Sequence, residues 1–212
     1  MTTPILVDRT SDGVATVTMN RPERMNSLTG DLLSMLAAKL REVADDSSVR
    51  VVVLTGAGDR AFSAGADLAP PDAPSPADRH TSGRQTLEES YDGLKRMQES
   101  SWILHSMPKP TIAAINGAVA GASLSMSMAC DLRVAADGAV FTTAFARIGF
   151  SGDFGGSYFA TKLLGSAKAR ELYLLGERFD SAEALRIGLL YRVFAQDVFR
   201  KEVDALAHRL AE

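Results

Sequence analysis

Hydrophobic and polar side chains alternate along residues 14–19, a period of two that predicts a β-strand with one face against a core. A different pattern begins at about Thr29. Apolar side chains recur there at spacings of one, three and four, which predicts an amphipathic helix that ends near Asp45. The apolar face of this helix consists of Leu32, Leu33, Leu36, Leu40 and Val43.

Two runs rich in apolar and β-branched residues, 49–55 and 111–115, predict strands that are buried on both faces. Each run leads into a loop rich in glycine and alanine, and we expect helices to start at Ala66 and Ala122 after these loops. This faint internal repeat of strands and helices predicts an α/β fold with mainly parallel strand pairing. Four prolines within residues 70–76 predict a loop between the two repeats.

The rest of the chain is expected to be mainly helical. Residues 85–105 have a helical pattern, and small residues and methionines predict a short helix over 123–129. Further short strands are expected at residues 131–135, 139–141 and 191–194. We expect residues 1–195 to form the core of the fold and residues 196–212 to begin a C-terminal helical region.

Composition limits the possible functions. The chain has 212 residues, 46% of them hydrophobic, which suits one domain with a sizeable core. The net charge of −3 is spread along the chain without a basic block, which argues weakly against binding to nucleic acid. The single cysteine, Cys130, excludes a disulfide within the chain and is expected to be a small buried hydrophobe. The sequence shows no secretory signal and no apolar run that spans a bilayer, so we predict a soluble cytoplasmic protein without membrane partners.

The two loops of glycine and alanine are the main candidates for chemistry. A loop of small residues that enters a helix leaves backbone N–H groups without partners at the positive end of the helix dipole. Two such N–H groups that converge can hold the negative charge that develops on a carbonyl oxygen. Either loop alone is better explained by close packing of helix on strand, so it is the pair that favours catalysis.

Other motifs of this kind are absent from the sequence. It has no G-x-x-x-x-G-K-[ST] phosphate loop, no G-x-G-x-x-G dinucleotide fingerprint and no G-x-S-x-G nucleophile elbow. His80, His105 and His208 are scattered and form no helical pair, so we predict no metal site.

Several motifs, in combination and in order, resemble the crotonase (enoyl-CoA hydratase/isomerase) superfamily. They are Arg21-Pro22 through Asn26-Ser27-Leu28, residues 62–68 (Phe-Ser-Ala-Gly-Ala-Asp-Leu), residues 109–117 and Cys130-Asp131. The similarity runs from about Val14 to the C-terminus. The resemblance implies a crotonase-like spiral of ββα units with a helical C-terminal part. It also implies an acyl-CoA thioester as the ligand, with coenzyme A as part of the substrate and no other cofactor, and a homotrimer or dimer of trimers.

The resemblance implies roles for individual residues as well. Ala66 and Ala122 would supply the two backbone amides of an oxyanion hole. Arg24 and Met25 fall where family members contact the CoA nucleotide, with Arg24 near a phosphate or, alternatively, a solvated surface charge. The other substrate-binding residues that the resemblance implies are Ala64, Asp67, Leu68, Gly121, Ser125 and Phe145.

Two positions depart from the family pattern. Hydratases of the family use two glutamates, and alignment through the flanking motifs puts Ser125 and Phe145 at those positions. Neither side chain is a carboxylate base, which argues against water addition by a glutamate pair. Asp153 lies where some related isomerases and aromatic acyl-CoA dehalogenases carry a catalytic aspartate, and it is the predicted base. The alternative for Asp153 is an N-cap of the helix that starts at Gly155 or Gly156.

The leading hypothesis is therefore an isomerase in which Asp153 moves a proton of the acyl chain while Phe145 keeps the pocket dry. The alternatives are a hydratase-like lyase that acts through a positioned water, a catalytically silent acyl-CoA binding protein, and a pure interaction protein. Trp102 and Tyr91 are candidates either for the acyl pocket or for ordinary core packing. Family members usually continue past the position of Glu212 with helices that cover the CoA site, so we expect either a natural short form or an incomplete chain.

Overall fold

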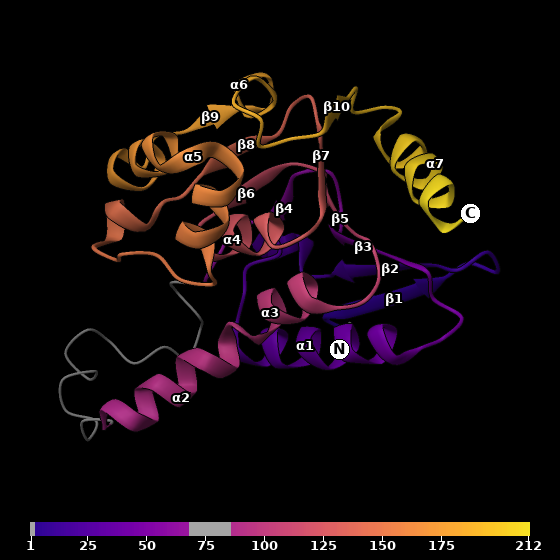
Figure 1. The fold of residues 1–212 in the computed structure, drawn as a ribbon, viewed down its shortest axis with the longest axis horizontal. Coiled ribbons are helices and arrows are strands. Elements are labelled where there is room, and N and C mark those ends of the chain that lie inside the picture. Colours follow the sequence, from indigo (N-terminus) through magenta and orange to yellow (C-terminus); the bar gives the residue numbers. More distant parts are fainter. Residues whose placement is uncertain (1–2, 68–85) are drawn as a thin grey trace.

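The computed structural model describes residues 3–67 and 86–212 and arranges them as two β-sheets surrounded by helices (Figure 1). Within these residues, the larger sheet has six strands. In spatial order they are β1 (Ile5–Arg9), β2 (Val14–Met19), β3 (Val51–Gly56), β5 (Thr111–Ile115), β7 (Leu132–Ala136) and β10 (Arg192–Phe194). Strand β1 runs antiparallel to β2, and all other neighbours in this sheet are parallel.

The smaller sheet has four short strands in the described part of the chain. In spatial order they are β4 (Ala61–Ser63), β6 (Ala118–Ala120), β8 (Val140–Thr142) and β9 (Phe179–Asp180). The first three are parallel to one another, and β9 is antiparallel to β8.

A repeated unit links the two sheets, because its first strand belongs to the larger sheet and its second strand to the smaller one. The units are β3 with β4, β5 with β6, and β7 with β8. Since β4 and β6 are parallel neighbours, the loops that follow them leave the same edge of the smaller sheet. This arrangement confirms the predicted repeat and the mainly parallel pairing. The helix expected to start at Ala66 would run into residues outside the described part of the chain.

Two helices, α1 (Gly30–Asp45) and α7 (Phe199–Ala211), pack on opposite faces of the larger sheet. Side chains alternate along β3, so Val52 and Leu54 join the cluster that contains the α1 leucines, while Val51 joins the cluster that contains α7. All residues of β3 are buried, which confirms the predicted strand with two covered faces.

The helix predicted over residues 85–105 is two helices in the structure. They are α2 (Leu87–Met97) and α3 (Glu99–Ser106). Helix α3 packs against α1 and α4 (Ala122–Met128) and buries its apolar residues Ile103 and Leu104.

Helix α2 extends away from the body of the molecule (Figure 1). The expected apolar side of this helix is exposed, and Leu87 in particular is 92% exposed. A capping box closes its first turn, because Thr86 Oγ1 accepts a hydrogen bond from the Glu89 N–H and the Glu89 carboxylate accepts one from the Thr86 N–H. Local capping therefore stabilises the start of a helix that makes few contacts with the sheets.

The remaining elements are η1 (Pro22–Arg24), η3 (Phe145–Ile148), α5 (Gly156–Leu175) and α6 (Ser181–Arg186). Every residue of α4 is buried, and α4 packs between α3 and α5 (Figure 1). The segment between η3 and α5, residues 149–155, carries Asp153.

Strand β1 was not predicted from the sequence. Its pattern is weak because β1 is an edge strand in which Ile5 alone is fully buried. Among the described residues, no helix is long and apolar enough to cross a membrane.

Candidate active site

The loops that follow β4 and β6 touch at Gly65. This residue has φ of +86°, and a Cβ atom on it would lie 2.6 Å from the Ala120 carbonyl oxygen and 3.8 Å from the Ala122 nitrogen. Both the positive φ angle and the close approach of the Ala120 carbonyl require a residue without a side chain at this position. Ser123 joins the loops further, because its hydroxyl donates a hydrogen bond to the Ser63 carbonyl at 2.7 Å.

The N–H groups of Ala66 and Ala122 belong to these two loops. Leu28 bonds to the first loop, accepting from the Asp67 N–H at 2.9 Å and donating to the Gly65 carbonyl at 2.8 Å, which turns the Ala66 N–H to the opposite side. Ala122 is the first residue of α4, where an N–H has no partner within the helix. Within the described residues, neither N–H donates a hydrogen bond to another backbone group. Two backbone donors of this kind in adjoining loops can bind a carbonyl oxygen.

Asp67 is the centre of a small charged cluster beside the first loop. Its carboxylate lies 3.1 Å from Arg24, 3.4 Å from Arg21 and 3.0 Å from the Ser27 hydroxyl, and its side chain is 5% exposed. Arg24 is held at this place while 43% of its side chain stays exposed. It is therefore an ion-paired cation that remains partly exposed to solvent.

Met25 and Ala64 lie next to this cluster. Met25 has φ of 53°, and its carbonyl accepts a hydrogen bond from the Ala64 N–H at 2.9 Å. The structure thus brings Arg24, Met25, Ala64 and Asp67 together on one side of the first loop. Leu68, the other residue predicted here, lies outside the described residues.

The other predicted substrate-binding residues surround the start of α4. Gly121 has φ of +54°, and a Cβ atom on it would lie 3.9 Å from the ring of Phe145. Ser125 lies one turn further along, with its hydroxyl 3.3 Å from the Gly121 carbonyl. Ser125 and Phe145 are both buried. The structure therefore groups Gly121, Ser125 and Phe145 around one end of α4.

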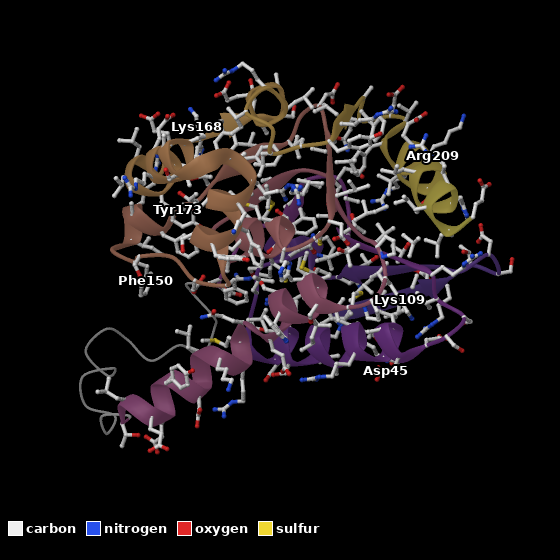
Figure 2. All side chains as sticks on the ribbon, in the orientation of Figure 1. Asp45, Lys109, Phe150, Lys168, Tyr173 and Arg209 are labelled. Carbon is white, nitrogen blue, oxygen red and sulfur yellow. The ribbon has the colours of Figure 1, made fainter. Side chains whose placement is uncertain are left out.

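Tyr173 of α5 connects two of these residues, although the sequence pattern did not predict it as part of a site. Its hydroxyl lies 3.4 Å from the Ser125 hydroxyl, and its ring stacks on Phe145 with centroids 5.9 Å apart and an interplanar angle of 10°. Figure 2 shows Tyr173 on the side of α5 that faces the segment carrying Phe150. Gly152 and Gly156, which precede and follow Asp153 in the sequence, leave room for the Tyr173 side chain.

Asp153 precedes α5 but does not cap it. The N-cap residue is Gly155, with φ of 73° and no side-chain hydrogen bond, so the capping interpretation of the Asp153 side chain is wrong. Only the backbone takes part, because the Asp153 carbonyl accepts a hydrogen bond from the Gly156 N–H at 3.0 Å. The Asp153 Oδ1 atom is buried and has no hydrogen-bond partner among the described residues. Burial raises the pKa of the Asp153 carboxyl group above its usual value, which favours a proton-accepting role near neutral pH.

A cavity of about 490 Å³ opens between α2, α3 and the start of α5, and the two residues that follow Asp153 contribute to its lining while Asp153 itself does not. It is lined by Lys95, Arg96, Gln98, Glu99, Ser101, Trp102, Phe154, Gly155 and Phe159. Trp102 is 68% exposed, so core packing, the alternative considered for it, is wrong. Tyr91 is 65% exposed and does not line this cavity.

The described residues contain no group of three or more His, Cys, Asp or Glu side chains that could hold a metal ion. Cys130 is buried as predicted, and burial raises the pKa of its thiol to about 12. A thiol of this kind is not a nucleophile at neutral pH.

Comparison with known proteins adds to this geometry. A family model described as enoyl-CoA hydratase/isomerase matches residues 9–212. The chain is 34% identical over 210 residues to the 1,2-epoxyphenylacetyl-CoA isomerase of Escherichia coli K12, covering 97% of this chain and 76% of the relative. It is 36% identical over 203 residues to the 4-chlorobenzoyl coenzyme A dehalogenase-1 of an Arthrobacter species, covering 95% of this chain and 70% of the relative.

Solved structures have the same fold. The crystal structure of an enoyl-CoA hydratase from Bacillus anthracis is similar with a TM-score of 0.86 and 31% identity, covering 99% of this chain and 77% of that chain. A putative enoyl-CoA hydratase from Streptomyces coelicolor is similar with a TM-score of 0.87 and 32% identity, covering 99% of this chain and 73% of that chain.

Proposed function

This chain belongs to the enoyl-CoA hydratase/isomerase family, whose members act on acyl-CoA thioesters, and we propose that it shifts a double bond in its substrate with Asp153 as the only carboxylate base. Its fold is the mixed α/β fold of crotonase-type structures, as expected. The observation that carries the proposal is the Asp153 carboxylate, which is half-buried, has an Oδ1 atom without a hydrogen-bond partner among the described residues and has a raised pKa.

The first step of the proposed mechanism uses the two loops. The thioester oxygen accepts hydrogen bonds from the N–H groups of Ala66 and Ala122, which makes the α-protons more acidic. A single donor of this type is worth roughly 2.7–4 kcal/mol of transition-state stabilisation in other enzymes. The Gly65 contact supports this step, because it keeps the two loops at a fixed separation.

Proton transfer is the second step. Asp153 removes a proton from the acyl chain, and the electron pair moves onto the thioester as an enolate. The same carboxyl group then returns the proton at another carbon, so the double bond moves and the atoms of the substrate are conserved. One carboxylate is enough for this reaction, whereas hydration by the family's usual route needs two.

The residues around Asp67 are proposed to hold the CoA part of the substrate. Arg24 and Met25 would contact the nucleotide, and Ala64, Asp67 and Leu68 would lie along the adenine and pantetheine. The ion pair between Arg24 and Asp67 supports this placement, because it holds the guanidinium beside the first loop while much of it stays exposed. Gly121, Ser125 and Phe145 would contact the acyl end, with CoA itself serving as part of the substrate and no other cofactor proposed.

The proposed proton transfer is tested by measuring deuterium uptake into the acyl chain of the substrate. The protein is incubated in D₂O with a panel of saturated and unsaturated acyl-CoA esters, and mass spectrometry measures deuterium uptake into the acyl chain. The parent is compared with Asp153→Asn and with Asp197→Asn, a matched control at an exposed aspartate. Uptake in the parent and the control, lost in Asp153→Asn, is the expected result.

Other outcomes separate the alternatives. Equal uptake in the parent and in Asp153→Asn would remove Asp153 from the mechanism and favour a hydratase-like lyase that acts through a positioned water. Binding of the esters without any uptake would favour a catalytically silent acyl-CoA binding protein. Absence of CoA binding would favour a pure interaction protein.

A homotrimer or dimer of trimers is proposed as the assembly. Analytical ultracentrifugation of the purified chain tests it, and a monomer at micromolar concentration would contradict it.

A further inference from the structure

Tyr173 lies at the point where three segments of the site meet. Its hydroxyl faces Ser125 on α4, and its ring stacks on Phe145 of η3. The third segment is the one that carries Asp153. A Cβ atom on Gly152 would lie 2.6 Å from the Tyr173 ring, and one on Gly156 would lie 2.0 Å from the Tyr173 hydroxyl. The phenol thus contacts the backbone on both sides of Asp153.

We infer that Tyr173 is a positioning residue that closes the space between Ser125, Phe145 and Asp153 and keeps water away from the Asp153 carboxylate. This inference rests on the proposed function, because it gives the reason why a site of this shape would transfer protons within the acyl chain instead of adding water. The positioning role is assigned to the aromatic ring of Tyr173 more than to its hydroxyl group.

The two glycines show how closely the phenol fits. Both the Tyr173 hydroxyl and the Ser125 hydroxyl would lie within about 2.1 Å of a Cβ atom on Gly156. Any side chain at residue 156 would therefore displace the phenol or the serine. Gly152 has φ of +101°, a conformation that favours glycine, and its Cα faces the ring directly. The segment that carries Asp153 is thus shaped around Tyr173.

Burial, rather than a neighbouring charge, is the main influence on the pKa of the Asp153 carboxyl group. Tyr173 is the titratable residue of α5 that interacts with Asp153, and α4 carries no ionisable side chain. On η3, the Arg147 guanidinium donates to the Gly176 carbonyl at 2.8 Å. Across the cavity beside Phe154 lie Lys95, Arg96 and Glu99. Burial accounts for the raised pKa of Asp153, and it is also the largest cause of the raised pKa of Tyr173.

Removal of the ring should therefore change both the carboxyl group and the reaction. In Tyr173→Ala, water reaches Asp153, and its pKa moves down toward the ordinary aspartate value. A water at this place gives one proton to Asp153 while its oxygen bonds to the β-carbon of a 2-enoyl-CoA, and the electron pair of the double bond moves into the enolate. Asp153 then returns the proton to the α-carbon, so the product is the 3-hydroxyacyl-CoA.

The experiment measures both effects in the full chain. The side-chain carboxyl ¹³C signal of Asp153, identified by its loss in Asp153→Asn, is titrated in the parent, Tyr173→Ala and Tyr173→Phe. Tyr191→Ala is the matched control, because Tyr191 is a partly exposed tyrosine outside the site. Mass spectrometry of reactions with 2-enoyl-CoA measures the 3-hydroxyacyl-CoA.

We expect the titration midpoint of Asp153 to fall in Tyr173→Ala and to stay unchanged in Tyr173→Phe and Tyr191→Ala. The hydroxyacyl product should increase by about tenfold in Tyr173→Ala alone. An unchanged midpoint in a folded Tyr173→Ala protein would overturn the inference. If this variant does not fold, Tyr173→Val provides the same test, because it removes the aromatic ring and leaves a smaller apolar side chain in its place.

The two proposals fail in different ways. Absence of deuterium uptake in the parent contradicts the proposed function, but the carboxyl titration still tests Tyr173. If the titration midpoint of Asp153 falls in Tyr173→Ala but no 3-hydroxyacyl-CoA forms, then Tyr173 does exclude water from the carboxylate. That result would overturn the claim that this exclusion decides between isomerisation and hydration.

Discussion

Gly65 and Ala120 pack backbone against backbone, with only 2.6 Å between the Ala120 carbonyl oxygen and the place where a Gly65 side chain would begin. This contact holds the loop of Ala66 against the loop of Ala122. We predict that Gly65→Ala separates the two amides and lowers kcat by about 10²–10³-fold, the loss expected for one oxyanion donor. Steady-state kinetics with the best acyl-CoA of the panel measures it.

The matched control for this substitution is Gly138→Ala. A Cβ atom at Gly138 meets nothing within 4 Å, so its kinetics should equal those of the parent. A folded Gly65→Ala protein with unchanged kcat would show that the two loops do not bind the reacting oxygen.

The pH dependence of the reaction should follow Asp153. The carboxyl group must be ionised to accept a proton, and burial raises its pKa. We therefore predict that kcat/KM falls as the pH decreases through a value above about 3.9, the ordinary pKa of aspartate. A profile of kcat/KM against pH measures this limb, and a limb at the ordinary aspartate pKa would contradict the burial argument.

The same burial should reduce the stability of the protein at neutral pH. Because the pKa of Asp153 is higher in the folded state than in the unfolded state, the folded state binds more protons between the two values. The free energy of unfolding therefore falls as the pH rises through this interval. Asp153→Asn removes the ionisable group, so we predict that it is more stable than the parent at pH 7 and that the difference disappears below the unfolded-state pKa.

Urea unfolding of the parent, Asp153→Asn and Asp197→Asn at several pH values measures this effect. The exposed Asp197 control should match the parent throughout. Lower stability of Asp153→Asn at pH 7 would mean that the carboxylate makes favourable interactions in the folded state.

Asp131 should contribute to stability through strand β5. Its Oδ2 atom accepts hydrogen bonds from the N–H and the hydroxyl of Thr111, each at 2.8 Å, and these bonds join the end of α4 to the start of β5. We predict that Asp131→Ala lowers the free energy of unfolding by about 1.5–3 kcal/mol, as for hydrogen bonds to a charged group. Urea unfolding measures the change, and Asp137→Ala, at an exposed aspartate, is the control.

Trp102 offers a direct signal of acyl binding. It is the only tryptophan of the chain, and it lines the cavity between α2, α3 and the start of α5 while 68% exposed. An acyl chain that extends past Gly121, Ser125 and Phe145 into this cavity would remove water from the indole, so we predict a blue shift of fluorescence with long acyl-CoA esters and little change with CoA alone. Equal changes with both ligands would place the acyl group elsewhere.

Much of the fold could be predicted because its signals are local. The leucines of α1 repeat with the period of a helix, and the continuous apolar run of β3 is typical of a strand covered on both faces. The repeat of strand and small-residue loop also indicated that Ala66 and Ala122 occupy equivalent places. Helix α2 shows the limit of such signals, because its apolar residues satisfy the helical period and yet remain exposed.

The role of Asp153 required the structure. An aspartate before a helix is a favoured N-cap, and from the sequence both interpretations were open. The left-handed conformation of Gly155 makes that glycine the N-cap residue and leaves the Asp153 side chain free of the helix. A backbone dihedral angle of this kind depends on what packs around the segment.

The sequence by itself determined the family, the two amide loops and the absence of a glutamate at Ser125 and Phe145, because each of these is a property of residue type and order. Only the tertiary structure showed that Tyr173 contacts Ser125 and Phe145 and that the Asp153 segment folds around its ring. The physical reason is that such contacts depend on how α5 is rotated and how closely it approaches α4. Neither the rotation of α5 nor its distance from α4 can be predicted from the spacing of residues along the chain.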